Sequence, residues 1–223
     1  MKIDLDKYEA DIKRIDGPVR FYTKDGKDPL PSVTSLLSTP DKEAGLARWR
    51  KYTKDHEWIT TRALARGTAV HEAVEEWCLN GMKPPKVMFY DHLMPALYKI
   101  MEQYVDTIHS VEIMMHNKDL GCAGTADLVC TMKNGLTVIG DYKTSEKQKQ
   151  TKWMKDYFVQ TMIYADMYER EVGRKIDGIM ILNVYEKPRP GCFPIVKQIS
   201  EEARTNVRKF IKSQSDKVIA QHG

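Results

Sequence analysis

The dipeptide Asn134-Gly135 separates two runs of strand-forming residues, and it restricts the fold of this chain more than any other feature. Asn-Gly between such runs is the strongest short-range signal for a β-hairpin, because a tight turn needs positive φ angles that these residues adopt at low cost. The flanking runs are GTADLVCTM at 124–132 and LTVIGDYK at 136–143. With a two-residue turn here, residues pair symmetrically about it, which places Asp127 opposite approximately Asp141 or Tyr142.

Other segments continue this pattern of short strands and long helices. VEIMMH at 111–116 is a third β-rich run, so a three-stranded meander is predicted. Before it, RFYTKDGKDPLPSVTSLL (20–37) predicts a hairpin with an Asp25-Gly26 turn, then a short helix after Pro31-Ser32. Helical patterns extend over about 41–80, where Gly67 marks a break or a close approach, and over 91–109. After the meander we expect a helix at about 149–172, strands at 178–186 and 193–199, and a helix at about 201–220.

This order of elements predicts an α/β fold with a mixed central sheet flanked by helices, plus an N-terminal helical region. The sheet should begin antiparallel and then use the helix at about 149–172 as a crossover. We expect residues 1–110 to form an N-terminal hairpin and helical region and residues 111–223 a core, together making one compact unit.

Composition narrows the choice of environment and partner. Hydrophobic residues make up 42% and charged residues 30% of the 223 residues, which is typical of a globular protein. No apolar run approaches the roughly 18 residues of a membrane span, and the acidic N-terminal segment is neither a signal nor a transit peptide. We therefore expect a cytoplasmic, intracellular protein with no membrane partner. The net charge of +4 permits nucleic acid as a partner without requiring it.

The four cysteines are scattered, with no CxxC pair, so a zinc or iron–sulfur site is not expected. We interpret them as reduced and partly buried core residues. They are Cys78, Cys122, Cys130 and Cys192.

The run LTVIG delivers Asp141 and Lys143 to the end of a buried strand. The two side chains lie two residues apart and therefore share one face, whereas Tyr142 points the other way and leaves its carbonyl near them. Asp127 on the preceding strand would bring a second carboxylate within reach of one cation. Buried acids are costly unless they are paired or bind a metal, and oxygen ligands suit Mg²⁺ or Mn²⁺. A neighbouring lysine can position the attacking water or stabilise charge on a phosphoryl group.

The alternative for Asp141 and Lys143 is a solvent-facing ion pair worth less than about 1 kcal/mol. Acid-any-lysine also occurs at Asp11-Ile12-Lys13 and at Asp25-Gly26-Lys27. Those two copies lie in a polar segment and a turn without a second acid on an adjacent strand. We predict that both lie on the surface.

Two further features accompany the acidic pair. His71 lies early in the helical segment RGTAVHEAVEEW, where it is either a metal ligand or an ordinary surface or core histidine. Gln160 and Tyr164 are spaced i, i+4 and therefore share one face of a helix.

Taken in order, these motifs resemble the PD-(D/E)XK nuclease superfamily, within it the RecB-like exonuclease branch. The stretch PSVTSLL (31–37) and the tryptophan-containing basic helix after it are further similar to those of mitochondrial genome-maintenance and phage exonucleases. The matching stretches cover roughly residues 20–186. They are Gly67 through His71, Gly124 through Asp127, Asp141-Tyr142-Lys143, and Gln160 through Tyr164.

The resemblance implies a restriction-endonuclease-like core and a role for each matching residue. Asp127 and Asp141 would be the principal ligands of one or two Mg²⁺ or Mn²⁺ ions, and His71 and the Tyr142 carbonyl would complete the site. Lys143 would position or activate the water. Gln160 and Tyr164 would hold the site or the nucleic-acid strand, and together these residues form the catalytic set.

This sequence departs from the family pattern in two respects. Ala126 precedes the first acid, where the usual motif has proline. The cysteines do not match those of relatives that hold an iron–sulfur cluster, so no cluster is predicted.

The resemblance implies that DNA is the partner, in a bacterial or phage-infected cell, during replication, recombination or repair. Lys and Arg contacts with phosphates would supply most of the affinity. Trp49 or Trp153 would either stack on bases or pack in the core. The predicted nucleic-acid contacts are Arg48, Arg50, Lys51, Lys54, Lys147, Lys149, Lys152 and Trp153, with Lys155 close by.

The predicted activity is that of a Mg²⁺-dependent deoxyribonuclease, an exonuclease that acts on single strands or free DNA ends. Three alternatives stay open at this point. The chain could be an endonuclease or nickase of the same superfamily, a non-catalytic nucleic-acid-binding module, or a metal-dependent hydrolase of another substrate.

Overall fold

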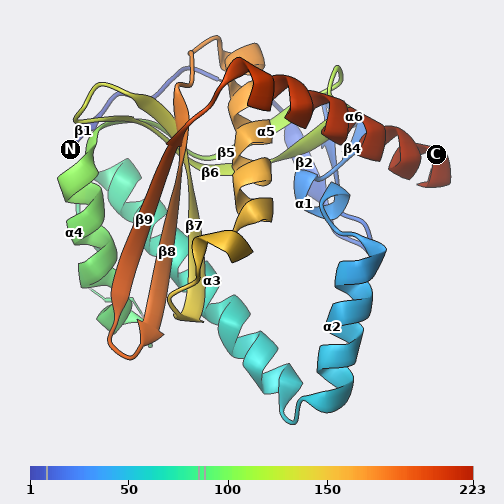
Figure 1. Ribbon diagram of the computed structural model, residues 1–223. Helices are drawn as coiled ribbons and strands as arrows, with labels where there is room; N and C mark the ends of the chain where they lie inside the picture. Colours follow the sequence, from blue (N-terminus) through green and yellow to red (C-terminus); the bar gives the residue numbers. More distant parts are fainter. Residues whose placement is uncertain (9, 85, 88, 223) are drawn as a thin grey trace.

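A six-stranded mixed sheet forms the centre of the protein, with helices on both faces (Figure 1). The computed structural model describes residues 1–222 except 9, 85 and 88. The strand order is β1-β5-β6-β7-β8-β9, and β1 and β9 form the two edges. The strands are β1 (Lys2–Ile3), β5 (Val105–Asn117), β6 (Cys122–Met132), β7 (Thr137–Lys147), β8 (Gly178–Lys187) and β9 (Gly191–Gln198). The predicted α/β fold class is confirmed.

The alternation of side chains along the strands divides the core into two layers. On β8, Leu182 and Val184 pack towards α3 (His56–Asn80) and α4 (Met94–Tyr104). Ile179 and Ile181 pack on the opposite face. That face is covered by α1 (Val33–Leu36), α5 (Lys155–Val172) and α6 (Glu201–His222). Both faces of the sheet are therefore buried, as expected for a strand run as apolar as GIMILNV.

The β6–β7 hairpin was predicted correctly, but its turn is longer than expected. The Met132 amide donates to the Leu136 carbonyl, and Gly135 adopts φ +87°. The loop therefore has three residues rather than two, because the last loop position needs the left-handed conformation that glycine accepts. The resulting register pairs Leu128 with Gly140.

The predicted crossover is also present. β7 pairs with β8 in parallel, and the connection contains the short helix η2 (Thr151–Trp153) followed by α5. In this register Lys143 lies opposite Asn183. The crossover carries Gln160 and Tyr164 back beneath the strands that hold the two acids.

A second, three-stranded sheet sits beside the start of β6. It contains β2 (Ile12–Ile15), β3 (Phe21–Lys24) and β4 (Lys27–Pro31). The predicted turn is confirmed, since Asp25 and Gly26 have φ of 52° and 69°. Ser32 caps the predicted short helix through its side chain, which accepts from the Ser35 amide. An isolated bridge between Ser32 and Ala123 links this sheet to β6.

Two element boundaries were predicted wrongly. The helix expected over 91–109 ends at Tyr104, after the short helix η1 (Asp91–Leu93), and β5 begins at Val105. The first part of β5 contains polar residues and two register shifts, so it lacks the two-residue alternation that marks a strand.

Gly67 lies inside the continuous helix α3, so it is not a break. The break lies instead between α2 (Pro40–Tyr52) and α3, where Asp55 adopts a left-handed conformation with φ 59°. In the described part of the chain, no helix has the length and apolar character of a membrane span. Cys78, Cys122 and Cys130 are buried and Cys192 is partly buried, all with free thiols.

Candidate active site

The site lies where β6 and β7 separate. Their ladder runs from Thr131 and Thr137 to Leu128 and Gly140, so Asp127 and Asp141 occupy the next position on each strand. Beyond that point the Tyr142 amide donates to Asp127 Oδ2 at 2.8 Å. The three-residue turn therefore brings the two acids to opposing positions.

Asp141 and Lys143 form a contact on one face of β7, as the alternation predicts. Lys143 Nζ lies 2.5 Å from Asp141 Oδ1, and the Asp141 side chain is only 2% exposed. Its other oxygen, Oδ2, is buried and has no hydrogen-bond partner among the described residues. The two other acid-any-lysine copies are exposed, as predicted. Of the three copies, only the Asp141–Lys143 pair is buried, and one of its carboxylate oxygens is left available to a further partner.

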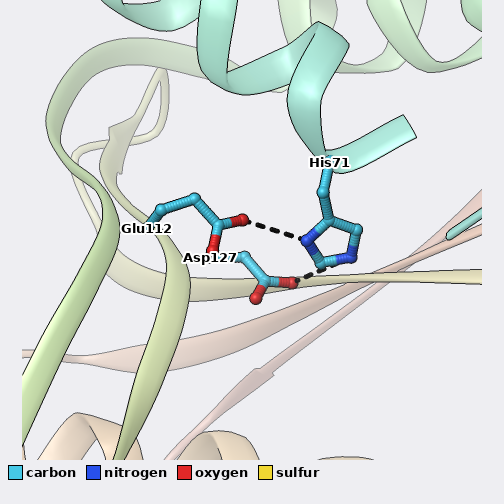
Figure 2. Close-up of side chains that lie close together, drawn as sticks. All are labelled: His71, Glu112 and Asp127. Atoms are coloured by element: carbon cyan, nitrogen blue, oxygen red, sulfur yellow. Dashed lines mark hydrogen bonds and ion pairs between the residues drawn. The ribbon is translucent and has the colours of Figure 1, made fainter. Parts of the chain in front are cut away.

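His71 reaches the same place from α3 on the other side of the sheet. Its Nδ1 lies 3.0 Å from Glu112 Oε1, and its Nε2 lies 3.7 Å from Asp127 Oδ2 (Figure 2). Its Nε2 also lies 3.1 Å from the Tyr142 carbonyl oxygen. Carbonyl and carboxylate oxygens accept hydrogen bonds, so both ring nitrogens have acceptors within reach. Burial lowers the pKa of His71, but the bond to Glu112 and the charge of Asp127 outweigh it and raise the pKa to about 9.

Glu112 is a member of this cluster that the sequence reasoning missed. It lies on β5 between Val111 and Ile113, whose partners are Leu128 and Ala126, and so it is opposite Asp127. Its φ of +46° is rare for a residue other than glycine and is typical of strained functional positions. The available signal was that Glu112 is the one acid in VEIMMH.

The electrostatics of the site reflect two buried acids close to cations. Burial and the neighbouring Asp141 raise the pKa of Asp127 to about 7. Burial lowers the pKa of Lys143, yet the charges of Asp141 and Asp127 outweigh it and the net shift is upward. A divalent cation near Asp127 and Asp141 would add to the positive charge of Lys143 and favour the ionised forms of both acids.

These residues fit a divalent cation. Ligand atoms of His71, Glu112 and Asp127 lie within 4.8 Å of one another and could hold a metal ion. Asp141 lies outside this group of three, with Oδ1 held by Lys143 and Oδ2 unpartnered among the described residues. A buried carboxylate oxygen without a donor is costly, and a hard cation would satisfy it.

Gln160 and Tyr164 share one face of α5, as predicted. Gln160 Nε2 donates to Tyr164 Oη at 3.3 Å, and both side chains are buried. The Tyr164 ring packs against Gly124, where an added Cβ would lie 2.7 Å from Cε1 of the ring. The pair therefore supports β6 from below, three residues before Asp127.

The predicted nucleic-acid contacts lie outside the cluster of Asp127, Asp141, Lys143 and His71. Arg48, Arg50 and Lys51 lie on α2, which has no buried residue, and Lys54 follows it. Lys147, Lys152 and Trp153 are exposed, Trp153 by 63%, so Trp153 does not pack in the core. Lys149 is half-buried and donates to Tyr157 Oη.

A cavity of about 620 Å³ opens over Lys143, His71 and Glu112. Its walls contain none of the eight predicted contacts. They instead include Arg14 and Arg20 from the β2–β3 region, which the sequence reasoning did not single out.

Fold and site together define the class of protein: a mixed sheet whose diverging strands present two acids and a lysine. The sequence model of the PD-(D/E)XK nuclease superfamily matches residues 43–222. The chain belongs to this superfamily.

The solved structures to which the chain is similar are distant in sequence. A candidate exonuclease from Eubacterium rectale is 14% identical, with 70% of this chain and 66% of that chain covered and a TM-score of 0.49. A phage-related exonuclease from Haemophilus somnus 129PT is 14% identical, with 86% and 96% covered and a TM-score of 0.37. The chain thus spans about two thirds of the Eubacterium rectale protein. A search of curated proteins gave no match.

Proposed function

We propose that this protein is a metal-dependent deoxyribonuclease, an exonuclease that hydrolyses phosphodiester bonds of single strands or free DNA ends. One observation carries the proposal: Asp141 is buried opposite Asp127, bonded to Lys143 through one oxygen and unpartnered among the described residues at the other. In an ion pair on the surface, the carboxylate would instead be exposed to solvent. The order of the motifs supports exonucleolytic action, in replication, recombination or repair.

The residues that would hold Mg²⁺ or Mn²⁺ are Asp127, Asp141, His71 and the Tyr142 carbonyl. Such an ion supplies Lewis acidity and makes a bound water more acidic. A histidine binds a metal through an unprotonated nitrogen, so His71 would hold the ion with Nε2 deprotonated. Glu112 holds the ring through its other nitrogen, which fixes the direction of Nε2.

Lys143 is positioned for the charge that develops on a phosphoryl group. Its ammonium is fixed by Asp141 at 2.5 Å and lies 5.2 Å from the centre of the Tyr157 ring. A cation held in place before the reaction stabilises developing negative charge without reorganisation. Lys143 also lines the open cavity, so substrate and water can reach it.

Exposed basic residues outside the acidic cluster would supply affinity for the DNA backbone. Arg48, Arg50, Lys51 and Lys54 form an exposed group on and after α2, and Lys147 at the end of β7 and Lys152 in η2 form a second group. Contacts of this kind make binding fall steeply with salt.

The test is digestion of end-labelled DNA in single-stranded, double-stranded and circular form, with Mg²⁺, with Mn²⁺ or with EDTA. Asp141→Asn and Lys143→Ala should each lower the rate by about a hundredfold or more, because each removes a charge at the reacting phosphate. Asp11→Asn and Lys13→Ala remove the same charges from an exposed copy of the motif and should digest DNA like the wild type.

Three outcomes are decisive. Linear DNA that survives Mg²⁺ and Mn²⁺ with the wild type would end the nuclease proposal. Circular single strands cut as fast as linear ones would establish an endonuclease instead. DNA that is shifted in a gel yet stays intact would indicate a binding module.

A further inference from the structure

Two arginines that line the active-site cavity converge on one carboxylate. Arg14 Nε and Nη2 each lie 2.8 Å from Asp16 Oδ1, and Arg20 Nε lies 3.2 Å from the same oxygen. Both arginines line the cavity that contains Lys143 and His71. The Arg14 and Arg20 side chains are 46% and 37% exposed, so an incoming anion can reach them.

The arginines stand on a firmly placed element. Arg14 belongs to β2, and Arg20 immediately precedes β3 and donates its amide to Ser35 Oγ at 3.0 Å. The small sheet is joined to β6 near Asp127, since Tyr22 Oη lies 3.3 Å from Thr125 Oγ1. This connection keeps the arginines at a set distance from the reacting centre.

Helix α3 contributes both small and charged side chains to the cavity lining. Ala63, Gly67 and Thr68 are the small ones, and Leu64, Glu72 and Glu75 also line the cavity. A polymer strand could therefore lie along the small side chains and reach Lys143, which lines the same cavity.

The charges in the cavity show why these arginines matter. Glu72, Glu75 and Glu112 line it and would repel a phosphate. Arg14, Arg20 and Lys143 line it too and carry positive charge. A nucleic-acid strand that enters here thus meets acids on α3 and needs the arginines for attraction.

We propose that Arg14 and Arg20 bind a backbone phosphate of the DNA strand beside the one that is cleaved, and that Asp16 occupies their anion-binding groups when DNA is absent. The inference rests on the proposed nuclease function. Guanidinium groups bind carboxylate and phosphate in the same forked geometry, so a phosphate replaces the Asp16 carboxylate without rebuilding the site. The hydrogen bond from Arg14 and the nearby charge of Arg20 lower the pKa of Asp16, so this carboxylate stays ionised and competes for the arginines at neutral pH.

The experiment measures DNA binding apart from cleavage. A fluorescein-labelled single-stranded oligonucleotide is titrated in EDTA, and its anisotropy is followed at several salt concentrations. Arg14→Ala and Arg20→Ala should each weaken binding about five- to tenfold. Each should also reduce the slope of log K against log salt by about 0.7.

Lys13→Ala is the matched control. Lys13 lies next to Arg14 on β2, points to the other face of the strand, and is 69% exposed beside Asp11. The substitution removes one positive charge from the same strand, and the affinity of this variant for DNA should stay within twofold of the wild type. Thermal melting checks that all three variants are folded.

Asp16→Asn tests the second half of the proposal. Loss of the competing carboxylate should tighten binding two- to fivefold at low salt, and weaker binding would overturn the role given to Asp16. If both arginine variants bind DNA like Lys13→Ala, the phosphate site is wrong even when the wild type digests DNA. If the arginine variants lose affinity and the wild type never cuts, the phosphate site stands and the proposed function fails.

Discussion

Gly124 determines how closely the Tyr164 ring approaches the strand that carries Asp127. A Cβ at this position would lie 2.7 Å from Cε1 and 2.8 Å from Oη of the ring. Tyr164 is 3% exposed and bonded to Gln160, so the ring has little room to move. Gly124→Ala should therefore lower the free energy of unfolding by about 1–3 kcal/mol, as overpacked cores do, when measured by urea denaturation.

Gly45→Ala is the matched control for this prediction. Gly45 lies in α2, and an added Cβ there meets nothing within 4 Å. Alanine in a helix interior should raise stability by up to about 1 kcal/mol. Equal stability changes for the two variants would contradict the close packing of Tyr164 against β6.

Residue positions fixed by local geometry were predictable from the sequence. Asp127, Asp141 and Lys143 follow from strand alternation and one hairpin, which involve neighbours along the chain. Glu112 was missed because its approach to His71 depends on the β5–β6 register and on a left-handed backbone within a strand. Arg14 and Arg20 were missed because the placement of the small sheet over the site depends on long-range contacts.

At the scale of elements, an ion pair holds α3 to the sheet at the residue where the helix becomes buried. Its residues from His56 to Ala65 include no buried side chain, and Arg66 is the first buried residue. Arg66 Nη1 lies 3.0 Å from Glu186 Oε1 on β8, and Arg62 Nη2 lies 2.8 Å from Oε2. His71 follows five residues later, so this pair helps to set where the histidine enters the site.

Glu186→Gln should destabilise the protein by about 3 kcal/mol or more, because it leaves the charge of Arg66 buried without a counter-charge. Urea denaturation measures the change, and hydrogen exchange should show faster opening of the first turns of α3. Glu146→Gln is the control on the neighbouring strand. Glu146 and its partner Lys187 are more than half exposed, so that change should cost less than about 1 kcal/mol. Similar losses for both variants would refute the anchoring role.

The helices and strands themselves were largely predictable because their hydrophobic periods are strong. The hairpin at Asp25-Gly26, the β6–β7 hairpin, the crossover and the last helix follow from local turn and period signals. The end of α4 was not predictable, since the first residues of β5 are polar and become a strand only through pairing with β6. Strands β1 and β2 were also missed, because their exposed residues show no alternation.

On the scale of the whole molecule, an ion pair joins the N-terminal segment to the end of the crossover between β7 and β8. Asp6 accepts from Tyr168 Oη and Arg174 Nε, each at 2.7 Å, and its side chain is 14% exposed. These contacts connect the segment after β1 with α5 and the residues that follow it, more than 160 positions away in sequence. The hydrogen bond from Arg174 is the main reason that the pKa of Asp6 lies below its usual value.

This lowered pKa fixes the sign of a pH effect. A carboxyl whose pKa is lower in the folded state contributes stability above its unfolded pKa of about 3.9, and that stability is lost as the pH falls through the folded value. Asp6→Asn should therefore cost about 2 kcal/mol at pH 7, the usual contribution of a hydrogen bond to a charged group. The difference from the wild type should shrink steadily below about pH 4.

Urea denaturation at several pH values measures the cost at pH 7 and its decrease at low pH, with the exposed Asp4→Asn as the control. A constant difference between wild type and Asp6→Asn from pH 7 to pH 3 would show that shape rather than charge joins the N-terminal segment to the end of α5.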